Sequence, residues 1–193
     1  VDSGAILYRE LSAGSELPQG MEEAQAPGHY RLQHTGTPRC FAWAVGPQAL
    51  KPQLFTPREA LWESERHTDG QLAFRPVEPE PRRLAVIGVR ACDLAALALQ
   101  DSHFLRAGDT DAYYARRREG LFLVAVNCTH PASTCFCVST GDGPQAEQGC
   151  DLVLDELDAG FAVAALSEAG ASLQQQLPLQ ALTEQQQAQI EHE

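Results

Sequence analysis

Two short, continuous apolar runs at residues 84–89 and 121–126 constrain the fold of this 193-residue chain more than any other feature. Each has the length that is typical of a strand and is too short for a helix of ordinary length. The first run follows a proline-rich segment, and the second follows Gly120. Continuous apolar sequence of this kind indicates strands that are buried on both faces, as in parallel sheets.

The segment between the two runs has helical periodicity. Apolar side chains recur at Leu94, Leu97 and Phe104, which predicts a helix over residues 91–105, and a second helix is expected at 110–118. A strand, a helical connection and a second strand make a βαβ unit, whose strands run parallel. We therefore predict an α/β fold in which a small mixed or parallel sheet surrounds a central βαβ unit.

The other expected elements are shorter. A hairpin is predicted from residues 29–33 and 40–45, a helix at 57–66, and brief strands at 72–74, 152–154 and 161–165. The chain should be helical from about residue 167, and Thr183 with Gln186 resembles a capping box for the last helix. We divide the chain into an N-terminal extension, residues 1–27, and a single α/β domain, residues 28–193.

Charge and hydropathy exclude several classes of partner. The chain has 26 acidic and 14 basic residues and a formal net charge of −12, which argues against binding nucleic acid. No run of 18 apolar residues is present, so no direct membrane insertion is expected. Six cysteines in a chain of this size, without a recognisable secretory signal, indicate metal ligands or reactive thiols in a reducing cytoplasm.

Four of the cysteines fall at one predicted place in the fold. Cys92 follows the first buried strand, Cys128 follows the second, and Cys135 and Cys137 lie in the irregular loop after Cys128. Because parallel strands end at the same edge of a sheet, the four thiols should meet at its carboxyl edge, where open α/β sheets bind ligands. Thiolates bind iron–sulfur clusters and zinc, and the spacing does not choose between them. The remaining alternative is that these cysteines are small buried apolar residues.

Nearby residues admit simpler explanations. Asp93 is expected to cap the helix that begins beside it. Arg90 could offset the charge of a thiolate-bound cluster or could be a surface charge at a strand end. His130 is expected to be a solvent-exposed loop residue, Cys40 to be a core residue in a strand, and Cys150 to be a structural residue at a strand start. No pattern of catalytic residues is recognised.

The order of several motifs resembles one known family. These motifs are Gly88-Val89-Arg90-Ala91-Cys92-Asp93-Leu94, Tyr113-Tyr114, Asn127-Cys128, Cys135-Phe136-Cys137 and Gly143-Pro144. They resemble the N-terminal part of the beta subunit of cytosolic sulfhydrogenase-type nickel–iron hydrogenases, and the A subunit of anaerobic sulfite reductase is similar. The resemblance runs from about residue 29 to residue 165.

This resemblance implies an electron-transfer iron–sulfur subunit of a multi-subunit oxidoreductase. Such a subunit relays electrons between a flavoprotein and a catalytic subunit, and its own sequence shows no catalytic site. The family's cysteines match Cys92, Cys128, Cys135 and Cys137, which implies that these residues hold a [4Fe–4S] cluster. The family's ferredoxin-like domain, with its two C-x2-C-x2-C-x3-C-P motifs, is not found in this sequence. A structural zinc domain and a docking or assembly module without metal remain the alternatives.

Overall fold

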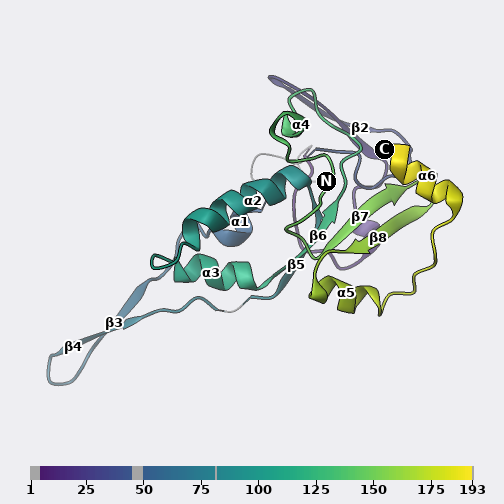
Figure 1. The fold of residues 1–193 in the computed structure, drawn as a ribbon. Coiled ribbons are helices and arrows are strands. Elements are labelled where there is room, and N and C mark those ends of the chain that lie inside the picture. Colours follow the sequence, from purple (N-terminus) through teal and green to yellow (C-terminus); the bar gives the residue numbers. More distant parts are fainter. Residues whose placement is uncertain (1–4, 45–49, 81, 193) are drawn as a thin grey trace.

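The central element of the fold is a four-stranded sheet with the strand order β5-β6-β7-β8 (Figure 1). A computed structural model describes residues 5–44, 50–80 and 82–192. The strands β5 (Leu84–Val89), β6 (Leu121–Val126) and β7 (Leu152–Leu157) run parallel, and β8 (Gly160–Ala165) is antiparallel to β7. The predicted α/β class and the parallel pairing of the two apolar runs are thereby confirmed.

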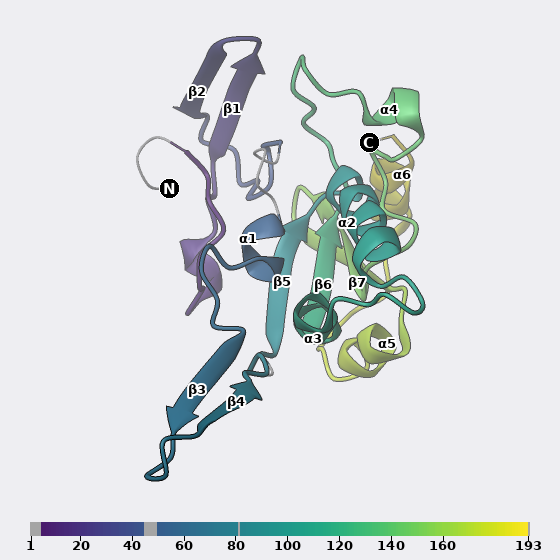
Figure 2. The ribbon, with the colours of Figure 1, turned by 90° about the vertical axis from the view of Figure 1, so that its left-hand side faces the viewer.

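Two helices connect β5 to β6, as the periodicity predicts. They are α2 (Ala91–Phe104) and α3 (Ala112–Glu119), and Figure 2 shows both on one side of the sheet. Leu94 and Leu97 of α2 pack with Leu123 of β6 in the main hydrophobic core. Tyr114 of α3 belongs to the same core, and its hydroxyl donates a 2.7 Å hydrogen bond to Asp101. This burial fixes the N-terminal end of α2 beside the end of β5.

The C-terminal part of the chain also follows the prediction. The strands expected at 152–154 and 161–165 are β7 and β8, and they are followed by α5 (Glu168–Gln174) and α6 (Glu184–His192). The Thr183 backbone N–H donates to Gln186 Oε1 at 2.9 Å, and the Gln186 N–H donates to Thr183 Oγ1 at 3.3 Å. The capping box at the start of α6 is therefore confirmed. No helix in the described ranges is long and apolar enough to span a bilayer.

The hairpin expected from residues 29–33 and 40–45 is wrong in its pairing. The strand β2 (His29–His34) pairs instead with β1 (Met21–Ala26), and residues 40–44 form no strand. Residue 45 lies outside the described residues. The expected boundary between the N-terminal extension and the domain, at residues 27 and 28, falls in the turn between the paired strands β1 and β2. The division of the chain into these two parts stays a prediction.

Buried charged side chains bind the backbone of residues 40–44 and take the place of a partner strand. Glu156, which is 3% exposed, accepts the N–H of Cys40 at 2.5 Å and of Phe41 at 3.0 Å. Glu23, which is 4% exposed, accepts the N–H of Ala44 at 2.5 Å. These partners satisfy backbone groups that would otherwise be buried without hydrogen bonds. The segment therefore packs in an irregular conformation, and the prediction that Cys40 lies in a strand is wrong.

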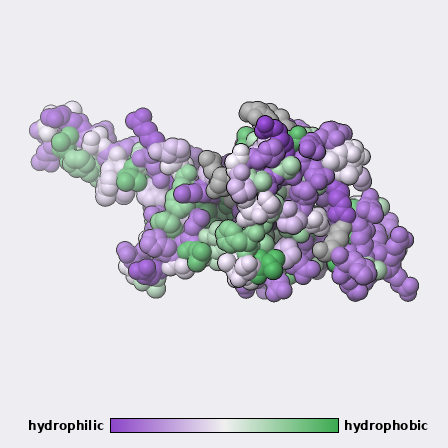
Figure 3. Space-filling view, turned by 90° about the horizontal axis from the view of Figure 1, so that it is seen from above, coloured by the Kyte–Doolittle hydropathy of each residue, from purple (hydrophilic) through white to green (hydrophobic). Residues whose placement is uncertain are grey.

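A two-stranded arm projects from the body of the molecule. It consists of β3 (Trp62–Arg66) and β4 (Leu72–Pro76), so the helix predicted at 57–66 is wrong and the strand predicted at 72–74 is confirmed. The turn uses Gly70 at a φ of +86°, and Glu63 forms an ion pair with Arg75 at 2.6 Å across the strands. Every residue of both strands is exposed, and Figure 3 shows apolar side chains on this projection. The remaining short helices are η1 (Gly14–Glu16), α1 (Lys51–Leu54) and α4 (Cys137–Thr140).

Candidate cysteine site at the carboxyl edge of the sheet

The ends of β5 and β6 place two cysteines at the same edge of the sheet. Cys92 is the second residue of α2, which begins directly after β5, and Cys128 comes two residues after β6 ends. The parallel pairing of β5 with β6 brings both strand ends to the carboxyl edge. Cys92 is exposed and Cys128 is partly exposed. This edge is where open α/β sheets bind ligands.

The loop after Cys128 closes back onto this edge. The Cys128 N–H donates to the carbonyl of Pro144 at 3.2 Å, and the Ala146 N–H donates to Asn127 Oδ1 at 2.8 Å. The Asn127 amide in turn donates to Asp155 Oδ1 of β7 at 2.6 Å. The outgoing and returning ends of the loop are thus held together above the sheet, with Cys135 and Cys137 between them.

Gly143 makes room for Cys137 beside the start of α2. A Cβ built on Gly143 would lie 3.3 Å from the Cys137 Sγ and 3.3 Å from the Ala91 Cβ. Cys137 begins the short helix α4 (Cys137–Thr140), and Ala91 directly precedes Cys92 in α2. The returning loop therefore brings Cys137 close to the N-terminal end of the helix that carries Cys92, and only a residue without a side chain fits between them comfortably.

Burial and neighbouring charges both act on the Cys92 thiol. Burial, followed by the negative charges of Asp93, Cys137, Cys128 and Cys135, raises the pKa of Cys92 to about 11. All three other predicted ligands therefore lie within electrostatic reach of Cys92. In the described residues, however, no group of three or more histidine, cysteine, aspartate or glutamate side chains has the arrangement of a metal site. Metal binding would therefore require the thiols to move closer together.

Asp93 has the capping role that the sequence predicts. Its carboxylate accepts the backbone N–H of Arg90 at 3.3 Å, at the start of α2. Burial raises the pKa of this carboxyl group to about 6, while the Arg90 N–H and the Arg90 guanidinium act in the opposite direction.

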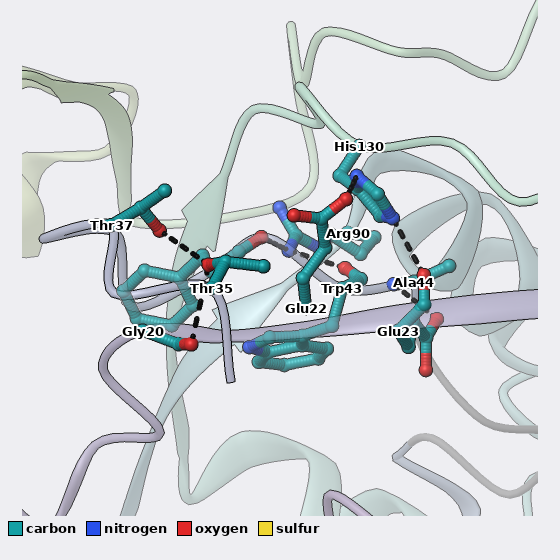
Figure 4. A network of polar contacts seen from close by, with 10 residues as sticks. Gly20, Glu22, Glu23, Thr35, Thr37, Trp43, Ala44, Arg90 and His130 are labelled. Atoms are coloured by element: carbon teal, nitrogen blue, oxygen red, sulfur yellow. Dashed lines mark hydrogen bonds and ion pairs between the residues drawn. The ribbon is translucent and has the colours of Figure 1, made fainter. Parts of the chain in front are cut away.

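Arg90 is buried, so the expectation of a surface charge at the strand end is wrong. The residue is 2% exposed, and Nη1 of its guanidinium donates to the carbonyls of Val126 and Asn127, both at 3.2 Å. Nη2 donates to the carbonyls of Phe41 at 2.5 Å and Trp43 at 2.7 Å. The guanidinium carbon also lies 4.9 Å from the centroid of the Trp43 ring, within the range of a cation–π contact. Figure 4 shows Arg90 hydrogen-bonded to Trp43, close to the strand that carries Glu22 and Glu23.

Sequence reasoning missed several residues around this edge. The Tyr8 hydroxyl donates to the carbonyl of Gly88 at 3.1 Å. Glu156 accepts the N–H of Phe41, whose carbonyl accepts a hydrogen bond from Arg90. Both contacts join positions that are far apart in the chain, 80 and 115 residues respectively. No local pattern in the sequence could reveal them.

The other candidates lie outside this group of thiols. Cys150 is buried in the main core, as expected, and burial raises its pKa. Cys40 is partly buried and packs against the smaller core cluster that contains Phe41 and Trp43. His130 is partly buried, against expectation: its Nε2 lies 2.8 Å from the carbonyl of Glu23. It lines an open cavity of about 370 Å³ whose lining includes no cysteine.

The residues present suit a thiolate-bound metal group. They supply four thiols as donors, a glycine that leaves space beside Cys137, and a buried cation that donates to the two residues before Cys128. None of the six cysteines, all of which lie in the described residues, forms a disulfide. The fold is an α/β domain in which Cys92 and Cys128 follow the ends of two parallel strands and the loop after Cys128 carries Cys135 and Cys137.

Comparison with known proteins relates this domain to hydrogenase beta subunits. The chain is 32% identical over 120 residues to sulfhydrogenase 2 subunit beta of Pyrococcus furiosus. The match covers 59% of this chain and 32% of that protein, so the match spans about a third of the length of the relative. No family model matches the chain, and no solved structure matches it.

Proposed function

We propose that this chain is an electron-transfer part of a hydrogenase-type or sulfite reductase-type oxidoreductase, and that Cys92, Cys128, Cys135 and Cys137 hold one [4Fe–4S] cluster. The observation that carries the proposal is that Cys92 and Cys128 follow the ends of the parallel strands β5 and β6, while the loop that carries Cys135 brings Cys137 close to the start of α2. The similarity to a sulfhydrogenase beta subunit supports it. A bound cluster would accept and release single electrons.

The chain's own residues would hold and enclose the group. The loop that runs from Cys128 to Pro144 is tied at both ends, so Cys135 and Cys137 can close over the edge without unfolding the sheet. Backbone N–H groups of this loop can donate to cluster sulfur atoms, a contact that tunes iron–sulfur sites. The reducing cytoplasm expected from the sequence would keep the thiols available, and we include that location in the proposal.

The proposed partners are a flavoprotein and a catalytic subunit. Exposed apolar side chains support docking of other chains at two places. Trp62 and Phe74 on the arm are 64% and 66% exposed, and Phe136 and Val138 beside the cysteines are 71% and 75% exposed. Large apolar side chains that are exposed together often mark interaction surfaces.

Metal analysis of anaerobically reconstituted protein tests the proposal. We expect about four irons and four sulfides per chain, with a brown colour. Replacing any one of the four proposed ligands should lower the iron content severalfold; the variants are Cys92→Ser, Cys128→Ser, Cys135→Ser and Cys137→Ser. Cys40→Ser and Cys150→Ala are matched controls that should load like the wild type, because Cys40 packs in the smaller core and Cys150 in the main core.

Two outcomes would overturn the cluster assignment. Colourless protein with about one zinc per chain would identify a structural zinc domain that uses the same thiols. Protein that binds neither metal, and whose stability is unchanged by Cys135→Ser and Cys137→Ser, would identify a docking module. Equal loss of iron in the Cys40 variant and in the four ligand variants would show that the ligand set is wrong.

A further inference from the structure

Arg90 joins the cysteine edge to the N-terminal segment. Its guanidinium donates to Val126 and Asn127, the two residues directly before Cys128, and on its other side to Phe41 and Trp43. Four hydrogen bonds to carbonyls on two separate segments fix the position of the charged group. The carbonyls of residues 126 and 127 belong to the stretch of chain that positions the Cys128 thiol.

The positive charge of Arg90 is buried without a direct carboxylate partner. Every hydrogen-bond acceptor of its guanidinium in the described residues is a backbone carbonyl, and Asp93 accepts the backbone N–H of Arg90 instead of its side chain. The Nε atom is buried and has no hydrogen-bond partner in the described structure. A buried charge is costly unless an opposite charge compensates it. Among the described residues, no carboxylate therefore makes a direct hydrogen bond to this guanidinium, although Glu156 and Asp93 act on it from further away.

Cys128 directly follows the two residues whose carbonyls accept hydrogen bonds from Arg90 Nη1. Burial lowers the pKa of Arg90, and among the negative groups that oppose this effect Cys128 comes first, before Tyr8, Glu156 and Asp93. When the thiols are protonated they supply no charge, whereas a thiolate-bound cluster would place negative charge at this edge. The buried cation and the cysteine site are thus complementary in charge.

We propose that Arg90 is the fixed counter-cation of the cysteine site: it holds the Cys128 segment in place and raises the reduction potential of the bound group. This inference rests on the function proposed above. On reduction, one electron from an external donor enters the oxidised cluster, no covalent bond forms or breaks, and the site becomes more negative by one charge. Arg90 keeps all its protons and stabilises this more negative state.

Mediated redox titration of the reconstituted protein tests this role. The wild type is compared with Arg90→Gln and Arg90→Met, which are neutral, and with Arg90→Lys, which keeps the charge. At the wild-type midpoint potential, we expect oxidised cluster to exceed reduced cluster by about tenfold in the neutral variants. For a one-electron couple, that ratio corresponds to a midpoint about 59 mV lower. Arg90→Lys should keep a midpoint close to that of the wild type while losing cluster more quickly, because lysine cannot bridge both segments.

The variants are chosen so that loss of stability and loss of charge give different results. Arg90→Met removes the cation but retains an apolar side chain that can pack on Trp43, and neutral replacement of a buried ion is often tolerated. Circular dichroism and melting identify which neutral variants are folded. Arg117→Gln is the control: this arginine is partly buried, and its described partners, the Leu54 carbonyl and Glu59, are not part of the cysteine edge. Its midpoint should equal that of the wild type.

The outcomes separate this inference from the proposed function. Wild-type protein that takes up no iron would contradict the cluster itself. If the wild type takes up iron normally, and the folded Arg90→Gln and Arg90→Met variants keep the wild-type midpoint potential, only the role of Arg90 is overturned. A lower midpoint in Arg117→Gln as well would also overturn it, because the shift would then follow from general destabilisation.

Discussion

The Sγ atom of Cys137 lies only 3.3 Å from the point where a Cβ on Gly143 would be. This contact joins the first residue of α4 to the returning end of the same loop. It leaves almost no tolerance for a larger residue at position 143, because ordinary contacts of this kind are longer. The loop thus combines two requirements, a sharp return toward α2 and free space beside a thiol.

Gly143→Ala is therefore expected to impair cluster loading without unfolding the protein. The added methyl group must push Cys137 or Ala91 aside, at a cost of about 1–2 kcal/mol. Iron content after anaerobic reconstitution should fall at least severalfold, as measured by elemental analysis. Gly14→Ala is the control, since a Cβ on Gly14 would meet no atom within 4 Å. Normal loading of Gly143→Ala would show that Cys137 is not held in its ligating position by this contact.

Glu156→Gln is expected to destabilise the fold by about 1–3 kcal/mol. The carboxylate uses one oxygen for Cys40 and the other for Phe41, whereas an amide has a single acceptor oxygen and would present an N–H₂ group to one of the two donors. Urea unfolding measures the change. Asp158→Asn is the control, because this side chain is 82% exposed and its ion pair with Arg39 spans 3.6 Å; it should change stability by less than about 0.5 kcal/mol. Equal effects of the two substitutions would show that the hydrogen bonds of Glu156 to Cys40 and Phe41 do not stabilise the fold.

The sequence predicts the centre of this fold well because the relevant signals are local. The apolar runs that become β5 and β6, with a periodic segment between them, are sufficient to place Cys92 and Cys128 at one edge of the sheet. The conformation of the N-terminal third of the chain could not be predicted from local signals of this kind. Residues 40–44 look like a strand by composition, but their partners are the side chains of Arg90 and Glu156, which come far later in the chain.

The arm illustrates a different difficulty. In residues 57–66, Leu61 and Trp62 would lie on one face of a helix, and Pro57 stands near its start, where proline is favourable. Both features predict a helix. The outcome depends on pairing with β4, where Trp62 lies opposite Pro76 and Ser64 lies opposite Phe74. A two-stranded ribbon alone is only marginally stable in water. Local sequence does not show whether such a pairing will form.

Fluorescence quenching should distinguish the two tryptophans of the chain. Trp62 on the arm is 64% exposed and Trp43 beside Arg90 is 6% exposed. Acrylamide should quench the Trp43→Phe variant, which retains Trp62, several times more strongly than the Trp62→Phe variant. Trp62→Phe should leave the free energy of unfolding within about 0.5 kcal/mol of the wild type, whereas Trp43→Phe should cost about 1–3 kcal/mol. Strong protection of Trp62 in the isolated chain would mean that the arm packs on the body, and its role in docking would be lost.

The hydrogen bonds from Glu156 to residues 40 and 41 also determine when the N-terminal segment can dock during protein synthesis. Glu156 lies 115 residues after the Phe41 N–H that it binds, so this part of the chain leaves the ribosome long before its partner exists. Chains are synthesised from the N-terminus and fold as their contacts become available. All four candidate ligands, from Cys92 to Cys137, are synthesised before Glu156. The four thiols are thus synthesised before the N-terminal segment can bind Glu156, and under the function proposed above a metal group could reach them before that contact forms.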